Sequence, residues 1–214
     1  MQNNNHNYFL DNKNMKRLFT LLASAVFTVA SYAQYNTGDI AINESTVYYG
    51  ARIGIDFSRL SGDFDCTGSR TGLTLGAVLG LHISEATPIC LETGIYYTER
   101  GAKSDDKRIS LSYLELPLLI KYGFEVGNNM AVLPYVGPYF SLGVGGKIKS
   151  NVEVTSSYNE AFNHPDMGMK FGCGFEYNHL YIEGGYQLGI ANISKEKMST
   201  IHGNAWFINI GFNI

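Results

Sequence analysis

The last ten residues of the chain alternate between large apolar side chains and mostly small or polar ones. One parity carries Trp206, Ile208, Ile210, Phe212 and Ile214, and the other is mainly asparagine and glycine. Because side chains along a β-strand point alternately to opposite faces, this pattern predicts a strand with one apolar face. The alternation recurs in nearly every apolar segment after Val47, with no helical segment to cover the apolar faces. These features together predict a closed barrel whose apolar side meets lipid.

Alternating segments recur along the rest of the chain, joined in turn by short turns and by longer polar loops. The expected strands are 47–58, 73–84, 89–98, 113–123, 131–145, 167–177, 180–190 and 205–214. The fold class is therefore all-β, a transmembrane antiparallel up-and-down barrel of about eight strands. The four longer loops, 59–72, 99–109, 146–166 and 191–203, are expected to face outward. Pro134 and Pro138 fall within one segment, so a bulge or bend is expected there.

The beginning of the chain is typical of a secretory leader. Met15-Lys16-Arg17 precedes an apolar run over 18–30 and the small-x-small sequence Ser31-Tyr32-Ala33. A membrane anchor is the weaker alternative, because the run is shorter than the roughly 20 residues that span a bilayer. The expected division is an N-terminal extension with a cleaved signal peptide over 1–33, a periplasmic lead-in over 34–46 and the barrel over 47–214. Met1 and Met15 both remain candidate starts.

Charged residues within the strands concentrate on the parity opposite to the apolar one. They are Arg52, Asp56, His82, Glu92, Glu115, Lys121, Lys170, Glu176 and Glu183. A soluble lipocalin-like barrel is disfavoured: with the apolar parity outside it would expose a belt far above the few hundred Å² that a soluble monomer tolerates. With that parity inside, aliphatic and aromatic bulk would crowd a lumen that about eight strands barely enclose. The nine residues are therefore expected inside, as a hydrogen-bonded polar network.

Aromatic residues fall near the ends of the expected strands. Tyr49, Tyr97, Tyr122, Tyr177 and Trp206 are on the outward parity, as expected of interfacial aromatic girdles. Tyr48 and Tyr96 are on the inward parity, where core packing is the better interpretation.

Other functional classes receive little support. The net charge of −3 provides no basic footprint, so nucleic acid is not an expected partner. Cys66, Cys90 and Cys173 show no pairing logic, and neither a metal nor a cofactor is expected. An acid/base site would need loop residues to converge, which no spacing demands, and we expect no enzyme. The loop residues considered are Asp105, Asp106, His164, Asp166 and His202.

The stretch Tyr113-Leu114-Glu115-Leu116-Pro117-Leu118-Leu119-Ile120-Lys121-Tyr122, with Pro134-Tyr135-Val136-Gly137-Pro138-Tyr139 after it, resembles the PorT family of outer-membrane β-barrel proteins of Bacteroidetes. The likeness extends more loosely over about Val47 to Ile214. It implies an integral barrel in the outer membrane of a Gram-negative cell, inserted by the barrel-assembly machinery with the last strand as signal. Ile214 stands where that signal often has an aromatic residue. The namesake of the family is linked to protein secretion.

The leading expectation is an outer-membrane barrel of structural or surface-interaction role, porin-like in architecture, with a filled polar lumen and outer loops that bind a partner. Outer-membrane lipid is the first expected partner, with envelope or secretion proteins as further candidates. The alternative is a narrow pore or an accessory factor for protein secretion. A lumen that conducts would use the inward carboxylates and lysines as a solute path or proton relay.

Overall fold

The computed structural model describes residues 47–62, 68–84, 87–103, 107–127, 129–150, 154–156, 164–193 and 201–214. The predicted signal peptide and lead-in lie outside these ranges. Within them, no helix is long and apolar enough to cross a membrane. The strands are β1 (Val47–Gly62), β2 (Gly68–Ser84), β3 (Thr87–Lys103), β4 (Lys107–Tyr122), β5 (Phe124–Gly127), β6 (Met130–Ser150), β7 (Val154–Ser156), β8 (Pro165–Tyr177), β9 (Leu180–Gly189) and β10 (Ile201–Asn213).

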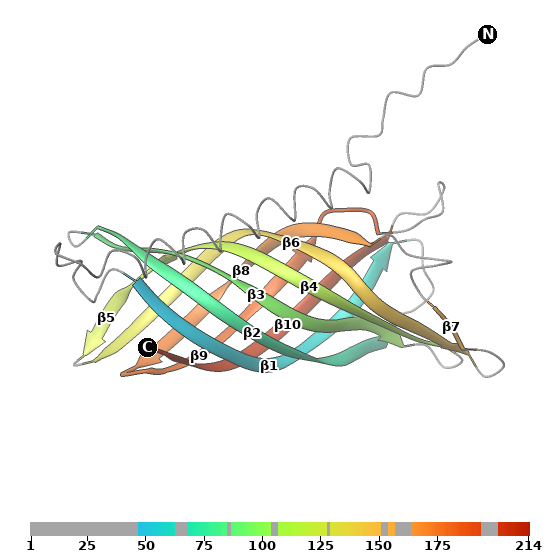
Figure 1. Ribbon diagram of the computed structural model, residues 1–214, viewed down its shortest axis with the longest axis horizontal. Coiled ribbons are helices and arrows are strands. Elements are labelled where there is room, and N and C mark those ends of the chain that lie inside the picture. The colour runs from blue at the N-terminus through green and yellow to red at the C-terminus, as the bar shows by residue number, and fades with distance from the viewer. Residues whose placement is uncertain are drawn as a thin grey trace, which may run out of the picture.

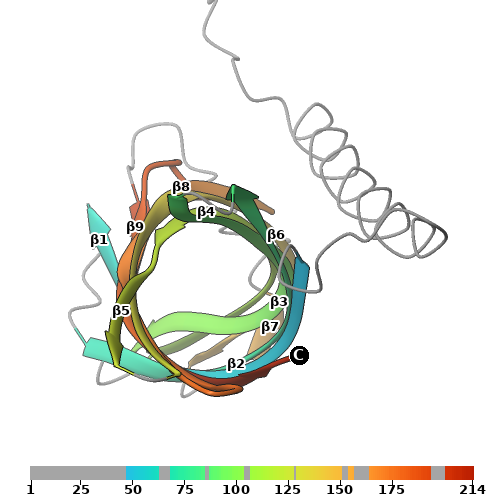
Figure 2. The same cartoon turned by 90° about the vertical axis from the view of Figure 1, so that its left-hand side faces the viewer.

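Eight long strands close into an antiparallel barrel, seen from the side in Figure 1 and along its axis in Figure 2. Each strand pairs with its sequence neighbour among the long strands, and β1 closes the barrel by pairing with β10 from Gly50↔Asn213 to Gly62↔Ile201. The short β5 and β7 extend this wall by pairing with β6. Closure leaves no open sheet edge within the wall, which is what a bilayer requires. The predicted fold class is confirmed.

The strands are longer than the alternation predicts, and almost all of the extra length is at one end. The short turns after β2, β5 and β8 lie at what we call the turn end, together with Val47 and Ile214. The opposite, loop end carries the longer connections. There β3 and β4 continue as a hairpin to Lys103 and Lys107, and β6 continues to Ser150. Hairpins extend by backbone pairing alone, so their length is not visible in hydrophobic periodicity.

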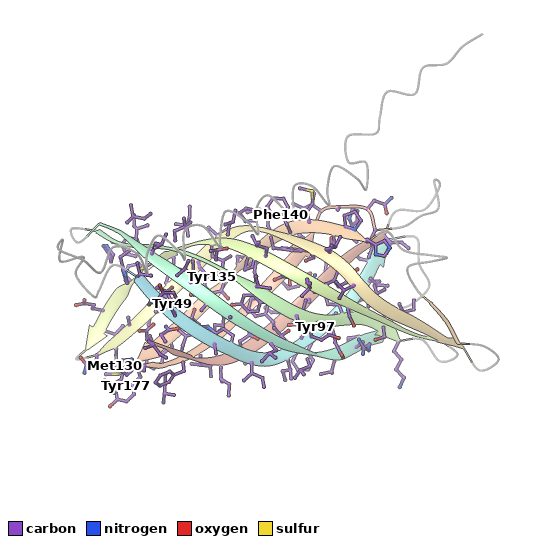
Figure 3. The ribbon with its side chains drawn as sticks, in the orientation of Figure 1. Tyr49, Tyr97, Met130, Tyr135, Phe140 and Tyr177 are labelled. Carbon is purple, nitrogen blue, oxygen red and sulfur yellow. The ribbon has the colours of Figure 1, made fainter. Side chains whose placement is uncertain are left out.

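The outward face is an apolar belt. Side chains stand away from the wall on all sides in Figure 3, where Tyr49 and Tyr177 are near the turn end and Tyr97 is further along the barrel. Ile53 is 48% exposed and Ile210 is 56% exposed. Trp206 and the outward tyrosines are also exposed, whereas Tyr96 is buried. Cys173 is on this face and Cys90 is buried. A surface of this kind is stable only against hydrocarbon.

The inward face combines glycine with large aromatic rings. A Cβ added at Gly76 would collide with the ring of Tyr96, and one at Gly80 with the ring of Tyr48. Gly174 similarly makes room for Tyr181. In each pair the glycine of one strand is covered by the aromatic ring of a nearby strand. This explains why glycine is frequent on the inward parity of a narrow barrel.

The bulge predicted around Pro134 and Pro138 is wrong. The β4–β6 register is unchanged from Pro117↔Tyr139 to Ile120↔Val136, and the β6–β8 register runs unbroken past both prolines. A proline has no N–H, so it omits a rung of the ladder without shifting the register. The irregularity lies nearer the loop end, where Ser112↔Gly145 is followed by Tyr113↔Gly143.

Two asparagines shape the turn end. Asn129 has φ of 60° and Asn178 has φ of 54°, the left-handed region that asparagine tolerates better than most residues. The two turns also contact each other, since the Asn178 backbone N–H donates to the Asn129 carbonyl at 2.9 Å. The tight turn predicted at Asn178-His179 is in place.

Substitution of Gly76 by alanine should destabilise the barrel, because the Tyr96 ring that it displaces is only 2% exposed and has nowhere to move. We expect a loss of about 1–3 kcal/mol, the usual cost of overpacking. Urea unfolding of the refolded protein in detergent, followed by the gel shift between folded and unfolded barrel, measures it.

Gly145→Ala is the matched control, because a Cβ at Gly145 would meet no atom within 4 Å. Equal midpoints for the two variants would contradict the glycine–aromatic packing described above.

Candidate functional site

The lumen holds a set of charged side chains that are almost fully buried. Within the described residues the buried cations are Arg52, Arg100, Lys121 and Lys170, and the buried acids are Asp56, Glu92, Glu115, Asp166 and Glu183. We call these nine residues the lumen network. Seven of them are among the nine that the sequence pattern places inside. Unpaired charge is costly to bury, so the arrangement of partners decides what the lumen can do.

Glu92 is the first centre of the lumen network. Its carboxylate accepts from Lys121 Nζ at 2.8 Å, from Arg52 Nη2 at 3.4 Å and from the Tyr48 hydroxyl at 2.7 Å. These donors come from β4, which pairs with the Glu92 strand β3, and from β1, which is two strands away beyond β2. One acid therefore ties three strands together through two cations and a phenol.

Tyr181 links the first centre to Glu183. Its hydroxyl accepts from Lys121 Nζ at 2.7 Å and donates to Glu183 Oε2 at 3.2 Å, and its ring lies 4.1 Å from the Arg52 guanidinium carbon. The other Glu183 oxygen accepts from Asn209 Nδ2 at 2.7 Å. These contacts cross the lumen from β4 to β9 and β10, which lie on the far side of the barrel interior.

Glu115 is the second centre and the most heavily coordinated acid. Its carboxylate is ion-paired to Arg100 and to Lys170, the latter at 3.1 Å. It also accepts from Gln187 Nε2 at 2.6 Å and from Ser141 Oγ at 3.4 Å. Lys170 Nζ lies 4.4 Å from the centre of the Phe207 ring, so an aromatic face covers the ammonium group.

Two members of the lumen network were not among the predicted site residues. Arg100 joins Glu115 to Asp166, whose Oδ2 lies 3.4 Å from Arg100 Nη1 and 3.4 Å from the Tyr139 hydroxyl. The sequence analysis assigns Arg100 and Asp166 to loops, whereas both lie within strands, β3 and β8. The available signal was parity, since Arg100 continues the inward series of Tyr96 and Thr98.

Asp56 is held by hydroxyl groups. The Thr74 and Thr98 side chains both donate to its Oδ2, the former at 2.7 Å. The two threonine oxygens are themselves 3.1 Å apart. The three residues come from β1, β2 and β3, so this cluster also binds adjacent strands to one another.

Two predicted lumen residues lie away from the buried set, near the turn end. Glu176 is half-buried and accepts from Asn213 Nδ2 at 2.8 Å. His82 is exposed, and its ring contacts the Tyr48 ring with centroids 5.8 Å apart. His82, which the sequence pattern places inside with the other eight residues, is therefore not part of the buried set, because it lies where the lumen opens at the turn end. A functional role for any of the nine stays a prediction.

An apolar cluster occupies the loop end of the lumen. Ile109, Leu111 and Ile193 are each 1% exposed and Ile201 is 3% exposed. We call the whole set the apolar cap; its members are Leu60, Ala102, Ile109, Leu111, Tyr113, Ile193 and Ile201. The Ile193 backbone N–H donates to the Ile201 carbonyl at 3.0 Å, which folds the start of the last loop over the barrel. Buried hydrophobic side chains thus occupy the lumen at its loop end.

The loop residues considered for an acid/base site do not come together where the structure describes them. His164 Nδ1 is 2.8 Å from the Gly143 carbonyl oxygen, and His202 Nδ1 is 3.1 Å from that of Ala191. Asp166 is buried against Arg100, and Asp105 and Asp106 lie outside the described residues. No group of three or more potential metal-ligating side chains occurs in the part of the chain that the structure describes.

The geometry of the lumen network favours a role in packing the interior over a catalytic role. Glu92 and Glu115, the two carboxylates that bind cations in pairs, are buried and hold several donors each. A general base needs a substrate proton within reach, and these groups are enclosed by protein on all sides. The lumen network therefore joins strands across the barrel.

Replacing Glu115 by glutamine should destabilise the folded barrel strongly, because Arg100 and Lys170 lose the negative charge between them. Breaking a buried pair from one side costs about 3–5 kcal/mol. Urea titration in detergent, read from the fluorescence of Trp206, measures the change.

Glu99→Gln is the control, since Glu99 pairs with Arg70 at 3.4 Å on a more exposed part of the wall. Its expected cost is about 0–1 kcal/mol. Two variants of equal stability would refute a central structural role for Glu115.

Known proteins with this architecture are found by comparison. The solved structure of Ail from Yersinia pestis is 14% identical, with a TM-score of 0.44, and the match covers 79% of this chain and 99% of Ail. Neisserial surface protein A, from Neisseria, is 15% identical with a TM-score of 0.49, covering 78% and 96%. OprG from Pseudomonas aeruginosa is 13% identical with a TM-score of 0.44, covering 82% and 99%. A search among curated proteins gave no match.

The family assignment comes from the sequence. The family model described as an outer membrane protein beta-barrel domain matches residues 32–195, which is more than half of the chain. The exposed apolar belt and the closed wall agree with a location in the outer membrane. The chain belongs to the outer membrane protein beta-barrel domain family.

Proposed function

We propose that the protein is a closed, non-enzymatic outer-membrane barrel with a structural or surface-interaction role. The observation that carries this proposal is the filled lumen, in which the lumen network is followed by the apolar cap. Barrels of eight strands have interiors just wide enough for side chains to fill. A solute would have to break several buried ion pairs and displace a hydrophobic cluster to pass.

The proposed orientation places the turn end in the periplasm and the loop end at the cell surface. Outer-membrane barrels have short periplasmic turns and longer external loops, and the two ends differ here in the same way. The barrel then starts and finishes on the periplasmic side, with Val47 and Ile214 close together: Tyr49 N–H donates to the Ile214 carbonyl at 2.9 Å. We also propose insertion by the barrel-assembly machinery with β10 as signal, as the resemblance to outer-membrane barrel proteins implies.

We further place the chain in the PorT branch of the family, in Bacteroidetes, on the Tyr113–Tyr122 stretch quoted above. In the structure this stretch supplies two members of the lumen network, Glu115 and Lys121, within β4. The branch motif therefore coincides with the interior of the barrel.

The purified barrel should be electrically silent. In a planar lipid bilayer we expect no stable stepwise conductance, because the cap and the ion pairs leave no continuous aqueous path. A large open porin reconstituted in the same way provides the positive control. Reproducible long-lived openings would replace the closed-barrel proposal by the narrow-pore alternative.

Deletion of the gene separates a structural role from an accessory role in secretion. We expect the proteins found in the culture medium and on the cell surface to be unchanged, as measured by quantitative proteomics. Loss of a defined group of secreted proteins, restored by the wild-type gene, would favour the secretion factor.

A further inference from the structure

The apolar belt is not smooth. A groove of about 690 Å³ crosses it over the seam where β1 closes on β10. The lining comes from five adjacent strands, β8, β9, β10, β1 and β2, and the exposed atoms of the lining are almost all apolar. The volume is within the roughly 300–1,000 Å³ of sites that hold small organic ligands. We call this hollow the seam groove.

The strand register explains the shape of the seam groove. One wall is a row of outward side chains that runs from Tyr177 in β8 through Phe212 in β10 to Ala51 in β1. The other wall is the next row of outward side chains, from Phe175 in β8 to Leu75 in β2. Positions of the inward parity lie between the two rows, so the backbone of the sheet forms the floor.

A small residue makes room at the seam. Ala51 is flanked in its row by Phe212 and Ala77, so its short side chain leaves space beside the Phe212 ring. A hydrocarbon chain in a groove touches protein on several sides, whereas a chain on the smooth belt touches it on one. Lipid is as apolar as the side chains of the belt, so these additional dispersion contacts are what favours the groove.

The seam groove climbs from the turn end toward the middle of the belt. A register row in this barrel is a spiral. The row that contains Phe175 and Leu75 begins at Val132 in β6 and returns to β6 at Leu142, nearer the loop end. The groove follows the first part of this spiral and finishes on β2, before the row reaches β3 and β4. Its beginning, at Tyr177, is at the turn end (Figure 3).

The dimensions of the seam groove match one acyl chain. Neighbouring strands are about 4.8 Å apart, so a groove over five strands is roughly 19 Å long. One leaflet of a bilayer contributes about half of the roughly 30 Å hydrocarbon core. A tilted acyl chain that starts at the membrane boundary and finishes near the middle of the belt can therefore follow the groove along its length.

Polar groups lie where such a chain would meet its head group. The Tyr177 side chain is exposed at the mouth of the groove. His179, in the turn after β8, contacts Phe212 with ring centroids 5.4 Å apart, and its Nδ1 lies 3.0 Å from the Asn213 carbonyl oxygen. Tyrosine is common at the level of lipid head groups, and its hydroxyl can donate to ester and phosphate oxygens.

We propose that the seam groove binds one acyl chain of a glycerophospholipid from the periplasmic leaflet, with the head group beside Tyr177 and His179. The choice of leaflet rests on the proposed orientation, in which the turn end is periplasmic. The groove is on the outward face of the wall, so its occupation does not depend on whether the lumen is closed.

Quenching of tryptophan fluorescence by a phospholipid with brominated acyl chains tests the groove. The reporter is Phe212→Trp in the full purified barrel in detergent, with Trp206→Phe to remove the only native tryptophan. We expect quenching that saturates at a single lipid per barrel. The control reporter is Ile120→Trp, exposed on β4 outside the groove, which should be quenched only in proportion to the lipid content of the micelle. The same quenching curve for both reporters would overturn the proposal.

Filling the groove locates the chain. Ala51→Phe places a ring in the space beside Phe212 and should raise the lipid concentration for half-maximal quenching about tenfold or more. Ile120→Phe adds bulk to the belt on β4 and should leave that concentration unchanged. The gel shift between folded and unfolded barrel confirms that both variants fold. An unchanged curve for Ala51→Phe, or an equal shift for Ile120→Phe, would exclude the seam groove.

A separate measurement tests the leaflet. An epitope tag inserted at Asp105, between β3 and β4, should be detected by antibody on intact cells, because the loop end is then at the cell surface. A hidden tag together with saturable quenching would reject the orientation and the periplasmic lipid with it. A visible tag without saturable quenching would reject the seam groove and leave the proposed function in place.

Discussion

Backbone hydrogen bonding in hydrocarbon is the constraint on which the rest of the structure depends. Every N–H and C=O of a membrane-crossing strand must find a partner in the protein, so the sheet closes by pairing β1 with β10. Closure with eight strands creates a narrow interior that must be filled. The outward face is set by lipid, and the inward face by the need to occupy that space.

The filling is mostly polar, and its value lies in the strands that it connects. Backbone ladders join each strand only to its neighbours, whereas Glu115 in β4 also reaches Lys170 in β8 and Gln187 in β9, two strands that do not pair with β4. A buried ion pair adds little stability relative to an apolar filling, but a broken one is expensive. The lumen network therefore penalises any arrangement in which these strands are displaced from one another.

Parity predicts which residues point inward, and this part of the sequence analysis matches the structure. The hydrogen-bond and ion-pair partners of these residues could not be predicted from the alternation, because residues far apart in sequence meet across the lumen, as Lys121 and Tyr181 do. The alternation also does not predict how far along the barrel axis a residue lies. Arg100 is buried in the lumen because β3 extends beyond the segment that the alternation predicts. His82 is on the inward parity but lies where the barrel opens. The apolar cap was missed for a related reason, since Ile109 and Ile201 fall in segments that the alternation assigns to loops.

Because the charged groups of the interior are already paired with other protein groups, the lumen offers no binding site, and any binding function must lie on the outer surfaces. The Glu92 and Glu115 carboxylates are already occupied by protein donors, so neither has a free site to offer a ligand without unfolding the wall around it. The outward belt contacts lipid chains, which recognise little beyond apolar area. A ligand or partner recognised by its polar groups would therefore have to bind at one of the two ends of the wall, outside the apolar belt.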